Sequence, residues 1–358
     1  MEQFDCKTRI YSGQNSLRSL ASLHISRLLI VADPFFCRNG TVNHVAHLSK
    51  AQAVEIFDQV TPDPSVTLVA AGTKLAQDFQ PDTLLALGGG SAMDCAKAIA
   101  LFSGLKLCLI AVPTTSGSGS EVTDFAILTH EGIKHPLVDA SLQPDIAILD
   151  SNLLMSLPKP LIAETGFDLI SHAMESWVAT GSGPISQCLA LQALKIAFSQ
   201  LHKSWEGDTE VRLSVHTAAT MAGMAFRSAG LGLCHAISHA LGGQFHKPHG
   251  QLNAILLPAV IDANSAAADS YAQLAQLLGY GNSESIALRN LKNALLRLRR
   301  QLKLPETLLQ AGIDPALLRK HRDTIVAAAL ADPCCATNPV PADEHTILHI
   351  LQAVTGHG

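Results

Sequence analysis

The chain has 358 residues, of which 47% are hydrophobic and only 15% are charged. This size and composition exclude an intrinsically disordered protein and predict a large core divided between two domains. The formal net charge is -5, so the basic surface typical of nucleic-acid-binding proteins is not expected. We expect a small-molecule ligand and no nucleic acid.

Eight cysteines are scattered along the chain without a Cys-x-x-Cys pair. In a chain of this length, that distribution predicts reduced thiols and a cytoplasmic location. The first residues lack the basic and then apolar pattern of a signal peptide, and no apolar run is long enough to span a membrane. We therefore expect no membrane contact.

The first part of the chain alternates between strand-like and helix-like segments. The expected strands are residues 27–34, 53–57, 82–87 and 107–112, and the expected helices are residues 41–49 and 65–78. This alternation predicts an α/β, Rossmann-like domain over residues 1–157. In such doubly wound sheets, ligands bind beyond the carboxyl ends of the strands.

Two polar, glycine-rich loops follow neighbouring strands. Gly88-Gly89-Gly90 opens an Ala-rich helix, and free N–H groups of Ser91, Ala92 and Met93 would face an anion such as pyrophosphate. The loop at 113–121 is dense in hydroxyl groups and could bind phosphate, ribose or carboxamide. Either loop alone could be a structural connector, but two of them after adjacent strands predict a dinucleotide site.

Asp33 ends the first strong strand. At that position a carboxylate can accept hydrogen bonds from an adenosine ribose, and it would repel a 2'-phosphate. Asp33 therefore favours NAD over NADP as the cofactor.

From about residue 158, apolar residues recur three and four positions apart, which predicts an all-helical domain over residues 158–358. The expected helices are residues 161–179, 187–201, 210–225, 230–241, 254–265, 270–278, 284–302 and 316–331. Residues 279–285 and 331–341 are expected to be loops.

Histidines gather in one stretch of this second part. His235 and His239 are four residues apart in an apolar run, so they share one helix face. Gly242-Gly243 is expected to end that helix, and the turn at Lys247-Pro248 would bring His249 back toward the same region. These histidines predict either a metal site or core residues satisfied by backbone carbonyls.

Asp168 and His172 form a second pair at helical spacing. Together with two of the downstream histidines they would supply one oxygen and three nitrogen ligands, a set that suits a divalent ion with an open position for substrate. The alternative for Asp168 is a carboxylate at a helix N-terminus, favoured by the helix dipole. That alternative does not explain His172.

Four stretches resemble the iron-dependent (group III) alcohol dehydrogenases: Gly88–Asp94, Pro113–Glu121, Gly166–Glu175 and Ala229–Gly250. The resemblance covers essentially the whole chain and is greatest to the short propanol and ethanol dehydrogenases of propanediol and ethanolamine utilisation. It implies a dehydroquinate synthase-like fold, with a dinucleotide-binding domain followed by a helical metal-binding domain. It also implies hydride transfer between NAD(H) and a small primary alcohol or aldehyde, such as propanol or propionaldehyde, or ethanol or acetaldehyde.

By this resemblance the metal ligands are Asp168, His172, His235 and His249. His239 would lie near the nicotinamide and the substrate and relay a proton, so His239 and His249 are the expected catalytic residues. The expected cofactor contacts are Asp33, Gly89, Gly90, Ser91, Asp94, Thr114, Thr115, Ser118 and Lys134.

The resemblance further implies ferrous iron, although zinc also accepts this ligand set. It implies a homodimer and leaves association with a bacterial microcompartment open. Gln251 and Val340 depart from the family pattern, at a position near the site and at a surface or interface position, respectively. The competing hypotheses are a glycerol-dehydrogenase-like polyol oxidoreductase and a non-catalytic NAD- or metal-binding subunit.

Overall fold

The computed structural model describes residues 2–130 and 133–356. The chain divides into two compact units, a sheet unit (Cys6–Leu157) and a helical unit (Met1–Asp5 together with Pro158–Gly358). The N-terminal segment belongs to the helical unit because the Glu2 carboxylate accepts hydrogen bonds from the backbone N–H groups of Ile185 and Ser186. These two residues lie at the start of helix α6 (Pro184–Glu206).

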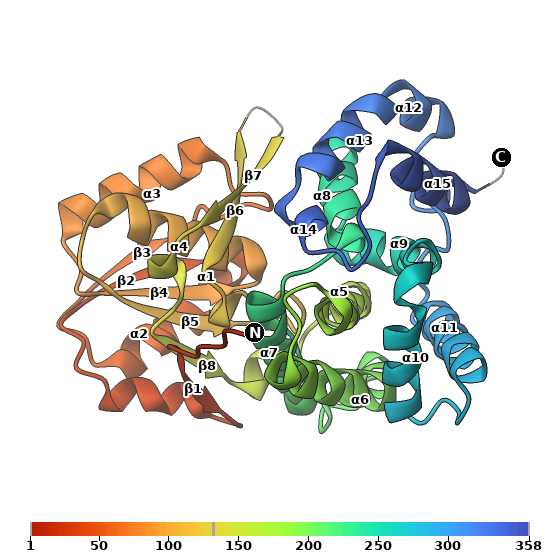
Figure 1. The fold of residues 1–358 in the computed structure, drawn as a ribbon. Coiled ribbons are helices and arrows are strands. Elements are labelled where there is room, and N and C mark those ends of the chain that lie inside the picture. The colour runs from red at the N-terminus through yellow and green to blue at the C-terminus, as the bar shows by residue number, and fades with distance from the viewer. Residues whose placement is uncertain (1, 131–132, 357–358) are drawn as a thin grey trace. The chain divides into compact units, whose positions relative to one another are not determined.

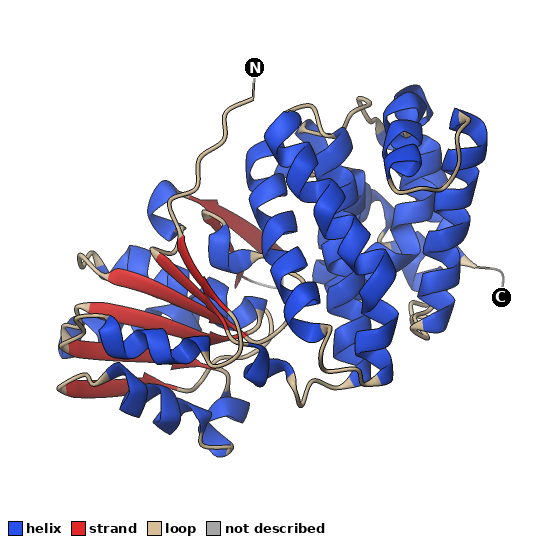
Figure 2. Cartoon of the chain, turned by 90° about the horizontal axis from the view of Figure 1, so that it is seen from below, coloured by secondary structure: helices blue, strands red, loops and turns tan. Residues whose placement is uncertain are grey.

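The sheet unit contains a six-stranded sheet with the order β1-β8-β5-β4-β2-β3, in which all neighbouring strands are parallel (Figures 1 and 2). The strands are β1 (Arg9–Ser12), β2 (Arg27–Ala32), β3 (Ala53–Phe57), β4 (Thr83–Gly88), β5 (Cys108–Pro113) and β8 (Ile146–Leu149). The helices are α1 (Pro34–Arg38), α2 (Thr41–Ser49), α3 (Val66–Phe79) and α4 (Gly90–Ser103). The predicted α/β architecture is confirmed.

Alternate residues of the central strands enter two separate cores. Leu84 of β4 packs in the core that includes residues of α3 and α4, whereas Leu85 packs in the core that includes residues of α2. Every residue of β4 is buried because both faces of the sheet are covered. The apolar runs in the sequence arise from this double burial.

Several short strands were not predicted from the sequence. β1 and β8 have four residues each, which is too few to show a clear period. β6 (Phe125–His130) and β7 (Ile133–Val138) form a separate antiparallel pair. Their connection at residues 131–132 lies outside the described part of the chain.

The helical unit is built around α5 (Lys159–Val178), which is continuously buried from Gly166 to Val178 and contacts α6, α7 and α9. Its other long helices are α7 (Arg212–Ala229), α8 (Leu233–Phe245), α9 (His249–Ala263), α10 (Ala268–Leu277), α11 (Glu284–Gln301), α13 (Arg322–Ala331) and α15 (Glu344–Thr355). Two short helices are α12 (Pro315–Lys320) and α14 (Pro333–Ala336). The prediction of a helical second part is confirmed.

Some predicted helix ends are wrong. Gly242-Gly243 does not end α8, which continues to Phe245, because the backbone ladder persists until His246 adopts a left-handed conformation with φ 52°. Residues 246–248 connect α8 to α9, which begins at His249. The predicted return of His249 toward the other histidines is confirmed, because its ring lies 5.2 Å from that of His235. The helix predicted over 316–331 is two helices separated at His321, and the loop predicted over 331–341 contains α14.

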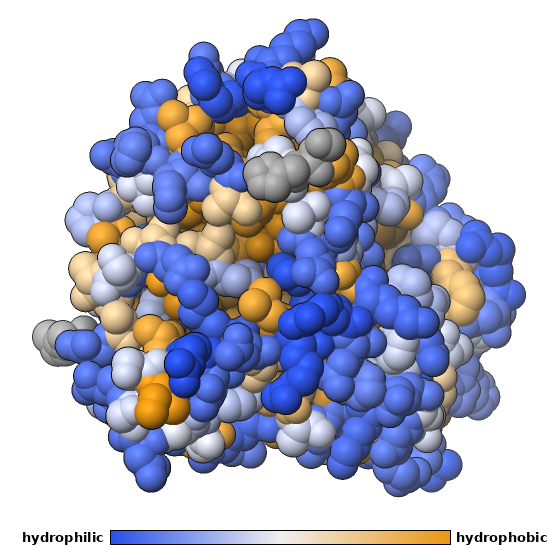
Figure 3. Space-filling view, turned by 90° about the vertical axis from the view of Figure 1, so that its right-hand side faces the viewer, coloured by the Kyte–Doolittle hydropathy of each residue, from blue (hydrophilic) through white to orange (hydrophobic). Residues whose placement is uncertain are grey.

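In the view of Figure 3 most of the surface is hydrophilic, and hydrophobic residues reach the surface chiefly in the upper middle of this face. Among the described residues, no helix combines the length and the apolar character that crossing a membrane requires.

Candidate metal centre and cofactor-binding edge

Except for Lys134, which lies on β7, the predicted cofactor residues of the sheet unit follow three neighbouring strands. The backbone N–H of Asp33, after β2, donates to the Leu87 carbonyl of β4 over 3.1 Å. The N–H of Thr114, after β5, donates to the Gly88 carbonyl over 2.9 Å. Asp33, the glycine turn and the hydroxyl-rich loop are thus brought together at the carboxyl edge of the sheet, where doubly wound folds bind ligands.

Gly89 and Gly90 lie beside the hydroxyl-rich loop. A Cβ atom on Gly89 would lie 3.3 Å from Thr115 Oγ1, and one on Gly90 would lie 3.6 Å from the Ser118 side chain. Side chains at these two positions would fill the space between the loops. The backbone of the turn and the hydroxyl groups therefore face a shared space, and this arrangement fits the phosphates of a dinucleotide.

Helix α4, which follows the glycine turn, starts at Gly90. This start is too early for the N–H groups of Ser91, Ala92 and Met93 all to be free for an anion, as the sequence predicted. The N–H groups of Ala92 and Met93 both donate to the Gly89 carbonyl over 3.1 Å. The prediction that these two amides are free is wrong because they already close the first turn of α4. The helix N-terminus available to an anion lies at Gly90 and Ser91.

Two of the predicted cofactor residues have partners within the protein. Asp94 Oδ1 accepts a hydrogen bond from the Ser120 hydroxyl over 3.3 Å, and burial raises the pKa of Asp94 to about 6 although Lys97 opposes this shift. The ammonium group of Lys134 lies 2.7 Å from Asp63 Oδ1. A cofactor role for Asp94 and Lys134 stays a prediction.

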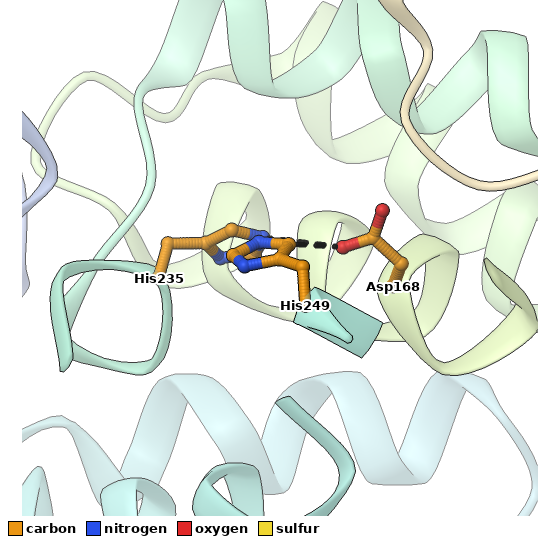
Figure 4. Close-up of side chains that lie close together, drawn as sticks. All are labelled: Asp168, His235 and His249. Atoms are coloured by element: carbon orange, nitrogen blue, oxygen red, sulfur yellow. Dashed lines mark ion pairs between the residues drawn. The ribbon is translucent and has the colours of Figure 1, made fainter. Parts of the chain in front are cut away.

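In the helical unit, three imidazole groups converge on one carboxylate oxygen. Oδ1 of Asp168, on α5, lies 3.8 Å from Nε2 of His235 on α8 and 3.6 Å from Nε2 of His249 on α9 (Figure 4). Nε2 of His172, one turn after Asp168, lies 3.8 Å from the same oxygen. Two ligands about 2.1 Å from one ion, at a tetrahedral angle, would be about 3.4 Å apart. Ligand atoms of Asp168, His235 and His249 lie within 4.8 Å of one another, so these three residues fit a bound transition-metal ion. His172 lies outside this group and its ring stacks on that of His235, so its role as a fourth ligand stays a prediction.

The electrostatics of the cluster favour a buried positive charge. Burial alone would raise the pKa of Asp168, but the imidazoles of His172, His249 and His235 hold it well below its ordinary value. Burial alone would lower the pKa of His235, yet hydrogen bonds to Asp168 and Glu175 raise it to about 9. A divalent cation would supply the charge that these carboxylates stabilise.

Hydrogen bonds at Nδ1 orient two of the histidines. His235 Nδ1 lies 2.5 Å from Glu175 Oε2. His249 Nδ1 lies 2.9 Å from the Ser238 hydroxyl, which itself donates to Asn253 Oδ1 and so accepts from the imidazole. With Nδ1 occupied in this way, Nε2 of each ring is the nitrogen that can bind a metal.

Two glycines allow the helices to meet closely enough for these contacts. A Cβ atom on Gly250 would lie 1.9 Å from the Glu164 carbonyl oxygen, so only glycine lets the start of α9 pack against α5. A Cβ atom on Gly232 would lie 2.8 Å from Glu175 Oε1. Because Gly232 has none, Glu175 accepts hydrogen bonds from the N–H groups of Gly232 and Cys234 and caps α8.

The alternative interpretation of Asp168 as a helix-terminal carboxylate is wrong, because α5 begins at Lys159 and Asp168 lies inside it. Sequence reasoning gave no role to Glu175 or Asn253. Glu175 lies two turns after Asp168 and Asn253 one turn after His249, so helical spacing was a usable signal for both. Asp332, whose Oδ2 lies 2.8 Å from His239 Nδ1, had no such signal.

Three aromatic residues lie within or just after the sequence motifs of the helical unit: Phe167, Trp177 and Phe245. Phe167 is buried, and Trp177 is buried with its indole N–H donating to the Ser270 carbonyl, so both belong to the core. Phe245 packs edge-on against His321 at the end of α8.

Comparison with known proteins identifies the family. Residues 7–151 match the description "Iron-containing alcohol dehydrogenase", and residues 162–355 match "Fe-containing alcohol dehydrogenase family, C-terminal". The chain is 39% identical to the 1-propanol dehydrogenase PduQ of Salmonella typhimurium, over 98% of this chain and 99% of the relative. It is 36% identical to the NADPH-dependent butanol dehydrogenase of Clostridium saccharobutylicum, over 99% of this chain and 98% of that relative.

Among solved structures, the fold is similar to an iron-containing alcohol dehydrogenase from Thermococcus thioreducens, with a TM-score of 0.92 and 31% identity. That match covers 98% of this chain and 99% of the other. Both parts of the chain and nearly its full length are thus accounted for by one family. The chain belongs to the iron-containing alcohol dehydrogenases.

Proposed function

We propose that this iron-dependent, NAD-linked alcohol dehydrogenase interconverts small primary alcohols and aldehydes, with propionaldehyde and 1-propanol as a representative pair. The observation that carries the proposal is the convergence of three imidazole Nε2 atoms on Asp168 Oδ1. The substrate class is supported by the relatives named for propanol and butanol. A homodimer and association with a microcompartment stay predictions from the family resemblance.

In this proposal Asp168, His172, His235 and His249 hold the iron. When bound there, the cation acts as a Lewis acid that polarises a carbonyl oxygen and lowers the pKa of an alcohol hydroxyl. Glu175 and Ser238 keep the Nε2 atoms of His235 and His249 directed at the cation through their Nδ1 contacts. The apolar residues of α5 and α9 keep water away from these charges, which strengthens the electrostatic interactions.

The sheet unit binds NAD in this proposal. The turn at Gly89 and Gly90 and the hydroxyls of Thr115 and Ser118 bind the phosphates and the adjacent sugar. One carboxylate oxygen of Asp33 caps α1 by accepting a hydrogen bond from the Phe35 N–H over 2.8 Å, which holds the side chain in place. Asp33 then selects NAD through its second oxygen and its charge. The other oxygen would accept from the ribose and repel a 2'-phosphate.

The test compares NADH oxidation with propionaldehyde, acetaldehyde and dihydroxyacetone by iron-loaded protein prepared without oxygen. We expect turnover with the two aldehydes and little with dihydroxyacetone. A preference for dihydroxyacetone would instead support a glycerol-type polyol oxidoreductase, and no turnover with any of the three would contradict the proposed function.

A further inference from the structure

A second histidine of α8 borders the metal cluster and has a carboxylate partner of its own. The ring of His239 stacks on that of His249, with centroids 4.9 Å apart and planes inclined by 13°. Its Nδ1 atom lies 2.8 Å from Oδ2 of Asp332, which follows α13. A residue about ninety positions away in sequence thus touches the ring that adjoins a metal-ligand candidate.

Asp332 is held in place at both oxygens. Its Oδ1 accepts from the Cys334 N–H over 2.8 Å and caps α14, while Oδ2 faces His239. Pro333 at the first position of α14 restrains the backbone further. Burial alone would raise the pKa of Asp332, but the bonds from His239 and Cys334 lower it, so the group is a carboxylate that accepts at both atoms.

His239, Asp332 and Cys334 also offer ligand atoms within 4.8 Å of one another, which raises the alternative of a second metal site. His239 Nδ1 and Asp332 Oδ2 are 2.8 Å apart, which is the length of a hydrogen bond. Two ligand atoms of one ion are expected to be farther apart, at about 3.4 Å. Burial and the adjacent Asp332 also raise the pKa of the Cys334 thiol well above its ordinary value, which disfavours the thiolate that a metal would need. The geometry therefore describes a hydrogen-bonded pair.

We propose that Asp332 is a positioning residue for alcohol oxidation, because it accepts the Nδ1–H of His239 and presents Nε2 of that ring as a hydrogen-bond acceptor for the substrate hydroxyl. The carboxylate fixes both the tautomer and the direction of the ring. An amide at this position could donate to Nδ1 and favour the opposite tautomer, whose Nε2 carries the proton and cannot accept. This inference rests on the proposed function.

The test measures kcat and KM for 1-propanol and NAD, together with iron content and thermal stability, in the iron-loaded enzyme. Asp332→Asn keeps an oxygen that can cap α14 but removes the carboxylate. We expect kcat to fall by about 10–100-fold, with the KM for NAD, the iron content and the melting temperature unchanged. Asp332→Glu should restore part of the loss, since it returns a carboxylate to the ring.

Two further variants separate positioning from a general structural effect. Asp314→Asn makes the same chemical change at the cap of α12, which is also followed by proline, and should leave kcat unchanged. In a His239→Ala background, Asp332→Asn should cause no additional loss, because its effect acts through that ring.

Wild-type kcat in the Asp332→Asn variant would overturn the inference, as would an equal additional loss in the His239→Ala background or a loss of iron. The wild-type enzyme is assayed alongside, so failure of the proposed function can be distinguished from failure of the positioning role of Asp332. An inactive wild type overturns the proposed function and this inference with it, whereas an active wild type matched by Asp332→Asn overturns the inference alone.

Discussion

Nδ1 of His235 lies 2.5 Å from Oε2 of Glu175, so a carboxylate of α5 fixes the ring of a histidine on α8. Both side chains are almost fully buried, with 1% and 2% of their surfaces exposed. The same carboxylate caps α8 through the N–H groups of Gly232 and Cys234. Glu175 therefore couples the start of α8 to the orientation of a metal-ligand candidate.

Replacing Glu175 by Gln should weaken metal binding by about 10–100-fold, the usual effect of removing a carboxylate that orients a metal-binding histidine. The affinity can be measured by competition with a chelator. Glu206→Gln is the matched control, because Glu206 faces His202 over 3.7 Å at an exposed site on α6. Equal affinities in wild type and Glu175→Gln would contradict the orienting role.

Replacing Gly250 by Ala should destabilise the helical unit and lower its metal content. The added Cβ would lie 1.9 Å from the Glu164 carbonyl oxygen, so α9 must move away from α5 and carry His249 with it. Overpacking of this kind costs about 1–3 kcal/mol. Thermal unfolding and metal analysis provide the measurement.

Gly90→Ala is the control, because its Cβ would make an ordinary contact at 3.6 Å, and it should leave the metal content unchanged. A Gly250→Ala protein with wild-type stability and metal content would refute the packing argument.

Lys97 stabilises the loop after β5 from within the sheet unit. Its ammonium donates to the Ser120 hydroxyl, to the carbonyl and hydroxyl of Thr123 and to the Phe125 carbonyl. Lys97→Met would leave buried acceptors unsatisfied, at about 1–3 kcal/mol each. It should lower the urea midpoint and raise the KM for NADH, whereas Lys74→Met on the exposed face of α3 should do neither.

The stability contributed by Lys97 should depend on pH. Burial lowers its pKa to about 8, although Asp94, Glu121 and Asp124 oppose the shift. Between about 8 and the ordinary value of 10.5, the unfolded chain binds more protons than the folded chain, so this contribution rises with pH over that window and is lost as pH falls through 8. The midpoint difference between wild type and Lys97→Met should widen from pH 8 to pH 10. A midpoint difference that narrows from pH 8 to pH 10 would contradict the lowered pKa of Lys97.

Asp33→Ser should shift cofactor preference toward NADPH. Serine keeps the cap of α1 but removes the charge that opposes a 2'-phosphate. Two unit charges about 4 Å apart interact by about 1 kcal/mol in water, so kcat/KM for NADPH relative to NADH should rise at least about fivefold. Steady-state kinetics with both cofactors test this, with Asp314→Ser at the cap of α12 as the control. An unchanged ratio would mean that Asp33 does not select the cofactor.

The sequence alone predicted those features of the fold and the site that depend on a local pattern of residues. Helical spacing paired Asp168 with His172 and His235 with His239, and buried apolar runs marked the central strands. Features decided by tertiary packing were missed or misjudged. Gly242 and Gly243 sit inside α8 because the continuous backbone ladder outweighs their low helix propensity, and Asp332 meets His239 only after α13 packs on α8.

The most direct test of the account is the metal content and activity of His249→Ala and Asp168→Asn, beside wild type and His202→Ala, an i,i+4 partner of Glu206 on α6. Each protein is stripped of metal without oxygen, reloaded with ferrous iron and assayed for NADH oxidation with propionaldehyde. We predict that iron restores wild type and His202→Ala, while the two ligand variants stay metal-poor and inactive. Normal iron content and turnover in either ligand variant would contradict the proposed centre.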